Sequence, residues 1–356
     1  MRSRRIILDL SLLIWLPIAA LVAHAQNSRE ASAVSYIERG ASWMEKGEID
    51  RAIADYGLAI AFDSRSTVAW RNRGVARQSK GDLAGALEDF NKAIKLNPRY
   101  FEAYINRGKL HSDLGESEAA LNDFNQAIAI NPGDTGAYNN RSAARQRAGD
   151  LDGALSDVNT AIKLDRRNAE AWSNRCGLRY RRGEYTEALA DCDGALKLDA
   201  RNAYAWNNLG LARQEKGDVD GAIADFDRSI ALAPRQADFH GNRGRAWLVQ
   251  GAVERALDDL NQALALDPGL AEAWSHRGAV WFAKQEFKRA IADYNQALKL
   301  KPGLADAYCS RAVAWLALGK PAEAEADFTR CRSLGGMPKP QAESLLREMK
   351  GRRASE

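Results

Sequence analysis

Residues 67–100 read TVAWRNRGVARQSKGDLAGALEDFNKAIKLNPRY, and this stretch has the pattern of two short amphipathic helices joined by a tight turn. Small, aromatic and arginine residues recur at spacings of three and four in its first half, which predicts one helix face. In the second half the apolar residues recur with the same period, from Leu83 to Ile94. Gly81 suits the left-handed end of the first helix, and Pro98 stops the second.

The same pattern recurs along the chain with a period of 34 residues and without an insertion. One aspartate and one alanine mark it in every unit. The aspartates are Asp55, Asp89, Asp123, Asp157, Asp191, Asp225, Asp259, Asp293 and Asp327. The alanines are Ala52, Ala86, Ala120, Ala154, Ala188, Ala222, Ala256, Ala290 and Ala324. Nine units therefore cover residues 33–338, and each helix pair is expected to stack on its neighbours because it cannot bury both of its faces alone.

Two units show most fully which known family the repeat resembles. In residues 203–236 the marker residues are Trp206, Leu209, Gly210, Ala222, Phe226 and Pro234. In residues 271–304 they are Trp274, Gly278, Trp281, Ala290, Tyr294, Ala297 and Pro302. The chain thus resembles the tetratricopeptide repeat family, which carries these residue types in this order. The resemblance implies an all-α fold, a right-handed superhelical α-solenoid of antiparallel helix pairs, with a concave groove that binds polypeptides.

An arginine replaces the family's leucine before the glycine in eight of the nine units, and only Leu209 keeps the family residue. The arginines are Arg39, Arg73, Arg107, Arg141, Arg175, Arg243, Arg277 and Arg311. Since every unit also carries the repeated aspartate, we predict a ladder of ion pairs in which each guanidinium holds a carboxylate through two hydrogen bonds. A charged track for a ligand is the alternative. Pairing within a unit and pairing between units are equally compatible with the sequence.

An asparagine precedes this position in six consecutive units. The six are Asn72, Asn106, Asn140, Asn174, Asn208 and Asn242. They fall on the first helix of each unit, which lines the concave side in the family that the chain resembles. A carboxamide offers both donors and an acceptor, so a row of them can hold a peptide backbone without reading its side chains. The alternative is that these side chains bond to neighbouring helices or to water.

Four further arginines replace the family's aromatic residue in the middle units: Arg77, Arg145, Arg179 and Arg213. Towards the C-terminus the first helices become apolar instead, with residues such as Leu248, Phe282 and Val313. One interpretation is a cationic groove with an apolar end, which would suit a partner with an acidic stretch and an apolar anchor. The other is that the arginines pair with nearby carboxylates and that a C-terminal helix covers the apolar end.

The four cysteines lie in two units, as the pairs Cys176 with Cys192 and Cys309 with Cys331. In an antiparallel helix pair, facing positions have a constant index sum, and both pairs satisfy the sum of about 32 that core positions have here. One interpretation is that each pair forms a disulfide, since disulfides persist in the oxidising compartment that an exported chain would meet. The other is that the four are small buried core thiols. The spacing does not suit a metal site.

Both ends of the chain differ from the repeats. Residues 1–25 begin with Met1-Arg-Ser-Arg-Arg5, continue with an apolar stretch to Val22 and close with Ala23-His24-Ala25, as a cleaved signal peptide does. The protein is therefore expected to be periplasmic or secreted, and to meet a membrane only if this segment is retained. Residues 26–32 form a polar leader. Residues 339–356 are expected to hold a capping helix with Leu345, Leu346 and Met349 on one side, and a tail.

Charge and motifs narrow the function further. The formal net charge is +4 for the whole chain, and 48 basic against 46 acidic residues remain without residues 1–25. That balance does not indicate a nucleic-acid partner. The sequence has no catalytic motif, so we predict neither enzymatic activity nor a cofactor or metal. A peptide- or protein-binding scaffold of the cell envelope is the favoured interpretation. A structural spacer, a membrane-anchored organiser or an accessory subunit of an envelope enzyme is the alternative.

Overall fold

The computed structural model of the chain describes residues 29–354, with the side chains of residues 29–349. Every regular element in this range is an α-helix, which confirms the predicted all-α class. The helices form two compact units, one ending at Asp165 and the other beginning at Arg166. The predicted signal peptide, residues 1–25, lies outside the described residues.

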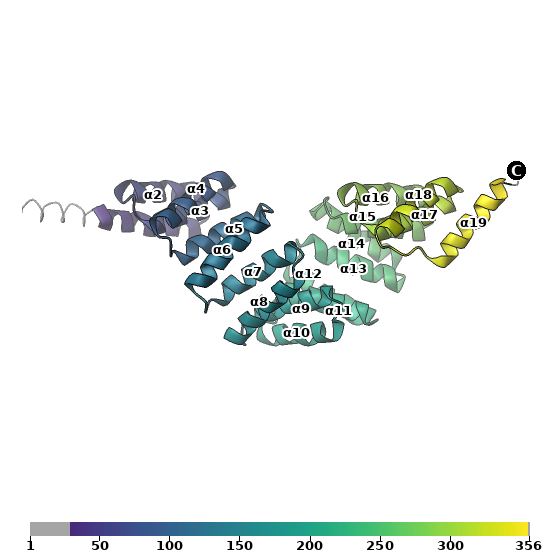
Figure 1. Cartoon of the computed structure of the whole chain (residues 1–356), viewed down its shortest axis with the longest axis horizontal. Helices are drawn as coiled ribbons and strands as arrows, with labels where there is room; N and C mark the ends of the chain where they lie inside the picture. The colour runs from purple at the N-terminus through teal and green to yellow at the C-terminus, as the bar shows by residue number, and fades with distance from the viewer. Residues whose placement is uncertain (1–28, 355–356) are drawn as a thin grey trace, which may run out of the picture. The chain divides into compact units, whose positions relative to one another are not determined.

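The first unit contains four helix pairs, which Figure 1 draws in purple to blue. Its first helix covers residues 29–45, so the last residues of the polar leader are helical. The others are α2 (Ile49–Phe62), α3 (Thr67–Lys80), α4 (Leu83–Leu96), α5 (Phe101–Asp113), α6 (Ser117–Ile130), α7 (Thr135–Arg147) and α8 (Leu151–Leu164). The two helices of a repeat pack against each other, and α4 and α6 also pack against the first helix of the next repeat. The first helices α3, α5 and α7 are in contact in sequence order.

The second unit repeats this arrangement five times and adds one helix, which Figure 1 draws in yellow. Its pairs are α9 (Ala169–Arg181) with α10 (Tyr185–Leu198), α11 (Ala203–Glu215) with α12 (Val219–Leu232), α13 (Ala237–Gln250) with α14 (Val253–Leu266), α15 (Ala271–Ala283) with α16 (Phe287–Leu300), and α17 (Ala305–Ala317) with α18 (Pro321–Ser333). The last helix is α19 (Pro340–Ala354). The first helices α9, α11, α13, α15 and α17 contact one another in sequence order. Within each unit this contact produces one surface made of first helices alone.

The turn inside each repeat follows from two residues. In residues 67–100, Gly81 takes a φ of 90°, which a residue without a Cβ adopts easily. The side chain of Asp82 then accepts a hydrogen bond of 3.0 Å from the backbone N–H of Gly85 and caps the second helix. In residues 271–304 Gln285 takes the place of the glycine with a φ of 61°.

A glycine on the first helix sets the distance between the two helices of most repeats. A methyl group on Gly74 would lie 2.6 Å from Cε1 of Phe90, and one on Gly210 would lie 2.7 Å from Cε1 of Phe226. The aromatic ring therefore packs directly on the helix backbone. Both rings are fully buried, and this contact is the centre of the repeat's core.

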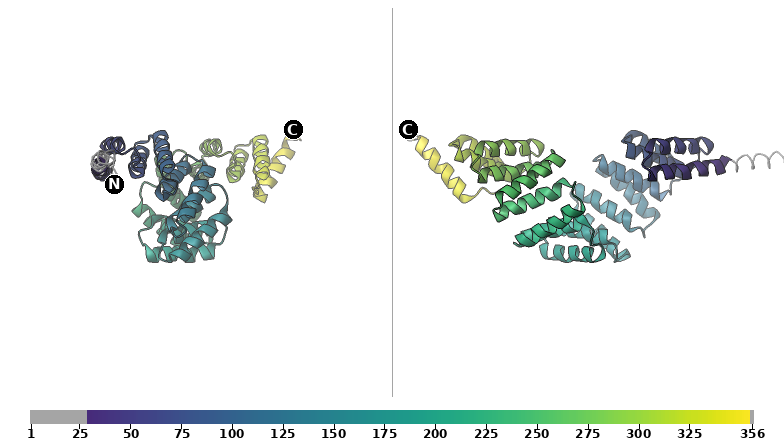
Figure 2. Two further views of the ribbon diagram at one scale, coloured as in Figure 1. Left: turned by 60° about the vertical axis from the view of Figure 1, so that its left-hand side comes forward. Right: turned by 180° about the vertical axis from the view of Figure 1, so that it is seen from behind.

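Helix α19 lies beside α17 and α18 at the end of the second unit (Figure 2). Ala342 and Leu346 are buried in a cluster with Leu316 and Phe328, and Met349 packs against it. The expectation that Leu345 shares this face is wrong, because adjacent residues of a helix point about 100° apart, and Leu345 is 43% exposed. The helix also continues past Lys350 to Ala354. Within residues 29–354, no helix combines the length and apolar character needed to span a membrane.

Candidate functional site

Each of the eight repeated arginines forms an ion pair with the aspartate of its own repeat. Arg141 is typical: its Nε and Nη2 donate hydrogen bonds of 2.9 and 2.6 Å to the two carboxylate oxygens of Asp157, which is 2% exposed. The same two-bond geometry joins Arg39–Asp55, Arg73–Asp89, Arg107–Asp123, Arg175–Asp191, Arg243–Asp259, Arg277–Asp293 and Arg311–Asp327. The hydrogen bond from Arg39 lowers the pKa of the Asp55 carboxyl. The pairing is therefore within the unit, and the carboxylates are buried with compensated charge.

The third nitrogen of several of these guanidinium groups reaches the preceding repeat. Nη1 of Arg141 donates a 2.7 Å hydrogen bond to the side chain of Asn125 on α6. Equivalent bonds join Arg107 to Asn91, Arg243 to Asp227, Arg277 to Asn261 and Arg311 to Asn295. The sequence interpretation missed this second contact, although the acceptor residues recur every 34 positions. One arginine thus holds a repeat together and also fixes it to its neighbour.

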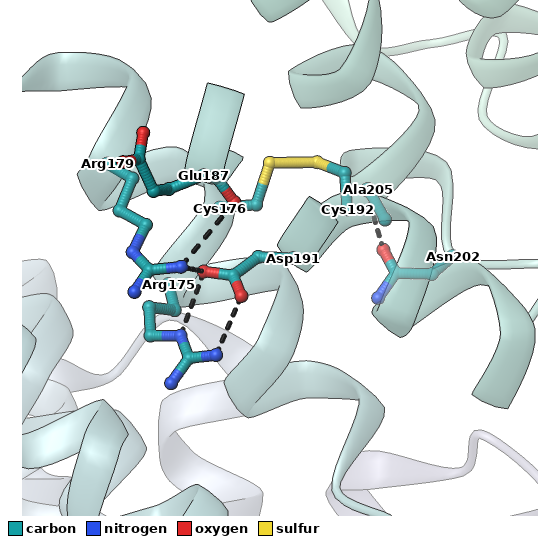
Figure 3. Close-up of a disulfide and its surroundings, with 8 residues drawn as sticks. All are labelled: Arg175, Cys176, Arg179, Glu187, Asp191, Cys192, Asn202 and Ala205. Carbon is teal, nitrogen blue, oxygen red and sulfur yellow. Dashed lines mark hydrogen bonds and ion pairs between the residues drawn. A yellow bond between two sulfur atoms is a disulfide. The ribbon is translucent and has the colours of Figure 1, made fainter. Parts of the chain in front are cut away.

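The four arginines at the aromatic position of the middle units bind the same buried aspartates. Nη1 of Arg145 lies 2.9 Å from Asp157 and donates to the carbonyl of Gly153, also at 2.9 Å. Arg77 lies 3.0 Å from Asp89, Arg179 lies 2.7 Å from Asp191 and Arg213 lies 3.0 Å from Asp225. Figure 3 shows both Arg175 and Arg179 on Asp191. These contacts match the interpretation in which the arginines pair with nearby carboxylates, so their charge is largely offset.

Asp225 differs from the other repeated aspartates because Leu209 stands where its arginine would be. The carboxyl group is 3% exposed and has Arg213 as its cationic partner. Burial raises the pKa of Asp225 to about 7, although Arg213 and Arg228 lower it, and the negative charges of Asp218 and Asp193 raise it further. This carboxyl group therefore changes its charge near neutral pH.

In the first unit, the asparagine row lies beside an open cavity. Asn106 on α5 and Asn140 on α7 line a cavity of about 280 Å³. Its other polar lining residues are Gln78, Lys109, Ser112, Asp113 and Arg147. Among the described residues, the side chains of Asn72, Asn106 and Asn140 have no hydrogen-bond partner. The cavity thus brings together the carboxamides of Asn106 and Asn140, whose hydrogen-bond donors and acceptors are not used by the described residues.

In the second unit the row is less uniform. Nδ2 of Asn242 donates a 2.9 Å hydrogen bond to Oδ1 of Asn207 on the preceding first helix, as the structural interpretation of the row expected. Asn208 leans towards α9, where a methyl group on Gly177 would lie 3.1 Å from its Nδ2. Asn174 and Asn208 make no hydrogen bond within the part of the chain that the structure describes. One of the three carboxamides is therefore engaged by the fold itself.

The asparagine row ends before the last two repeats, and apolar residues line a cavity there. Phe282 on α15 and Val313 on α17 line a cavity of about 400 Å³, together with Asp306 and with Met337 and Lys339 from the segment before α19. Helix α19 covers Leu316, and Val313 packs against the same cluster, so the interpretation in which a C-terminal helix covers the apolar end holds for that part. Phe282 and Val313 still line the cavity, which α19 does not fill.

Both cysteine pairs are joined as disulfides. Cys176–Cys192 links α9 to α10 (Figure 3), and Cys309–Cys331 links α17 to α18. Cys176 and Cys192 are fully buried, whereas Cys309 borders the cavity beside Val313. In residues 29–349 no three His, Cys, Asp or Glu side chains are grouped so that they could hold a metal ion.

Models of the tetratricopeptide repeat and the TPR repeat match the chain over residues 77–134 and 178–304. The matched segments are 77–115, 101–134, 178–217, 207–271 and 271–304. The chain belongs to the tetratricopeptide repeat family. Proteins with tetratricopeptide repeats generally bind other proteins. No curated protein matches the sequence.

Solved structures of tetratricopeptide repeat proteins resemble the chain in fold. A tetratricopeptide repeat protein from Parabacteroides merdae is 21% identical with a TM-score of 0.57, covering 70% of this chain and 98% of that one. The APC/C hetero-tetramer Cut9-Hcn1 gives 15% identity and a TM-score of 0.64, over 89% and 76% of the two chains. Pseudomonas aeruginosa pilF is 19% identical with a TM-score of 0.52, covering 58% of this chain and 94% of that one. At these identities the likeness concerns the fold alone.

Proposed function

We propose that this tetratricopeptide repeat protein is a non-catalytic scaffold that binds an extended polypeptide along its first helices. The observation that carries the proposal is the cavity between α5 and α7, where the carboxamides of Asn106 and Asn140 are not bonded to any described residue. A carboxamide can donate to a backbone C=O and accept from a backbone N–H, so the pair suits a chain in extended conformation. Such contacts read the backbone and impose little sequence preference.

The charge of the cavity comes from residues outside the ion-pair ladder. Arg77, Arg145, Arg179 and Arg213 are engaged by buried aspartates, so an acidic stretch in the partner is not part of this proposal. Lys109, Asp113 and Arg147 border the cavity, and Arg147 donates to the carbonyl of Ser112 at 3.2 Å. The two basic side chains can donate to carbonyl oxygens of a partner backbone, and the Asp113 carboxylate can accept from its N–H groups.

We place the scaffold in the cell envelope on the strength of residues 1–25 alone. Their basic start, apolar core and Ala23-His24-Ala25 ending are typical of a cleaved export signal. N-terminal sequencing of the protein from its own cells should give a first residue near Gln26. A chain that still begins at Met1 would contradict export by this route.

The binding proposal is tested by removing the two carboxamides. The variant carrying Asn106→Ala and Asn140→Ala should bind a partner recovered from envelope extracts about tenfold more weakly or worse, since each lost hydrogen bond contributes about 1 kcal/mol. Asn122→Ala, an exposed residue on α6, is the matched control and should bind as the parent does. Circular dichroism checks that both variants fold. Equal affinity of the double variant and the control would refute the proposal.

A further inference from the structure

The two disulfides of the second unit lie in different surroundings. Cys176 and Cys192 are both fully buried, in a cluster that also holds Leu209. Cys331 is fully buried as well, whereas its partner Cys309 is only partly buried. Each cross-link joins the two helices of one repeat. The chain therefore carries a matched pair of disulfides that differ in how far solvent reaches them.

Cys309 borders the apolar pocket at the end of the second unit. This pocket is the cavity of about 400 Å³ that Phe282, Val313 and Met337 line. Its volume lies within the range of cavities that hold small ligands. Cys309 therefore lies next to a space that a small molecule can enter, which is true of neither cysteine of the fully buried disulfide.

The other sulfur atom of this disulfide is covered by the segment before α19. A methyl group on Gly336 would lie 2.5 Å from Sγ of Cys331, and 2.9 Å from Cβ of Ala305 on α17. The backbone N–H of Gly336 also donates a 2.9 Å hydrogen bond to the carbonyl of Cys331. The backbone of this segment thus packs directly on Cys331. A reagent from solvent can approach the cross-link at Cys309 and not at Cys331.

Charge does not decide the reactivity of this site. Asp306 and Lys339 both line the pocket, so a thiolate meets one negative and one positive side chain there. Thiol–disulfide exchange proceeds by attack of a thiolate on one sulfur atom, and its rate depends on access to that atom. Access is therefore the property that separates Cys309 from the three other cysteines.

We propose that Cys309 is a site of reversible modification by a low-molecular-weight thiol. The thiolate enters the apolar pocket, and its sulfur forms a bond to Sγ of Cys309. The bond between the two cysteines breaks, its electron pair leaves on Sγ of Cys331, and that sulfur takes up the proton that the incoming thiol lost on ionising. The product is a mixed disulfide on Cys309 and a thiol on Cys331, so no further oxidant or reductant is consumed. Attack by Cys331 on the mixed disulfide restores the cross-link.

This inference is independent of the proposed function. The added group would occupy space beside Phe282 and Val313, and α17 would no longer be cross-linked to α18. Both changes fall in the last two repeats. The cavity beside Asn106 in the first unit should therefore be unaffected.

Peptide mapping after exposure to L-cysteine tests the proposal. The full chain, purified without reductant, is incubated with L-cysteine at about pH 8, where part of the thiol is ionised. It is then treated with excess N-ethylmaleimide and unfolded in urea, so that every free thiol is capped. Mass spectrometry should find cysteine attached to Cys309 and the maleimide on Cys331. The cross-link between Cys176 and Cys192 should react about tenfold more slowly or not at all.

Two substitutions in the pocket separate access from other effects. Ala279→Leu places a larger side chain in the pocket and should slow the reaction at Cys309 about fivefold or more. Met337→Ala removes a side chain from the lining and should leave the reaction at least as fast as in the parent. Leu345→Ala, an exposed position outside the lining, is the matched control and should react as the parent does. Circular dichroism checks that each variant folds.

Several results would overturn the inference. Cysteine attached mainly to Cys331, equal reaction rates of the two disulfides, or a cross-link at Cys309 that stays intact throughout would each exclude this site. A folded Ala279→Leu variant that reacts as fast as the parent would show that the thiol does not enter through the pocket. If this variant does not fold, the map of the parent chain decides alone.

Discussion

At the scale of single residues, the arginine that replaces the family's leucine is held from several directions. Arg277 donates to both oxygens of Asp293 at 2.7 and 3.0 Å and to Asn261 of the preceding repeat at 2.9 Å. Its guanidinium carbon also lies 4.6 Å from the ring centroid of Trp274. Only a planar group with several donors can make these contacts together, which is why lysine would not substitute for it.

Leu209 removes this arginine from one repeat, and Asp225 is where the consequence can be measured. The folded pKa of about 7 lies above the ordinary carboxyl value, so the folded chain holds the proton more tightly than the unfolded chain. The stabilising contribution of the proton is complete below about pH 4 and is lost as the pH rises through 7. Between pH 5 and pH 8 we therefore expect the unfolding free energy of the parent to fall by on the order of 2 kcal/mol. The Asp225→Asn variant has no carboxyl group at this position and should not show this fall.

Urea unfolding at the two pH values measures this difference, and a ¹³C titration of the carboxyl group measures the pKa itself. Leu209→Arg is the matched variant, because it restores the guanidinium of the other eight repeats and should lower the titration midpoint. A midpoint near 4 in the parent chain would show that burial does not control this group.

At the scale of helices, the buried disulfide replaces a packing contact. Cys176 and Cys192 occupy the positions of Gly210 and Phe226 in the next repeat, where the ring packs on the helix backbone. A cross-link and a glycine-aromatic contact thus fill the same space between two helices. In this repeat the side chains of Cys176 and Cys192 together occupy the space that the aromatic ring fills in the next repeat.

This equivalence predicts different outcomes for two double variants. Cys176→Ser with Cys192→Ser should lose about 3 kcal/mol, the value expected for a cross-linked loop of about 15 residues. Cys176→Gly with Cys192→Phe also lacks the cross-link but refills the core, and should recover about 1 kcal/mol or more of that loss. Urea unfolding without reductant measures both. Equal losses would mean that packing does not compensate at this position.

Helix α19 provides a test of end capping with two adjacent leucines. Leu346 is 8% exposed and packs in the cluster with Leu316, whereas Leu345 is 43% exposed. Leu346→Ala should cost about 2–3 kcal/mol because it leaves a cavity in a buried cluster. Leu345→Ala should change stability by less than about 0.5 kcal/mol. If thermal unfolding gives the two variants equal stability, α19 does not cap the second unit.

At the scale of the whole molecule, the 34-residue period predicts the helix pairs and the residue types of the ion-pair ladder, because the same positions recur in every repeat. It does not predict whether each arginine pairs within its own repeat or with the next one. The period does not predict whether Arg145 faces a ligand or a carboxylate, because both roles need an arginine at the same position of the first helix. The contact of Arg141 with Asn125 was missed although its residues recur. The pocket at Met337 could not be predicted, because the segment before α19 lies outside the repeat.

Each unit of the molecule presents its own surface. The first unit has a cavity with carboxamides of Asn106 and Asn140, and the second ends in the apolar pocket beside Phe282. Most of the arginines that recur every 34 residues are held in the ion-pair ladder. Binding therefore depends on amides, apolar groups and a few remaining charges. We propose for both units that a polypeptide lies against the first helices.

Site-specific photocross-linking tests that claim most directly. A benzoyl-phenylalanine replaces Ala143, which lines the cavity between α5 and α7, or Asn122 on α6 as the control position. After irradiation in envelope extracts, mass spectrometry should identify a peptide segment joined to position 143. This cross-link should be lost when Asn106 and Asn140 are also replaced by alanine. Equal cross-linking from both positions, or none from position 143, would contradict the account.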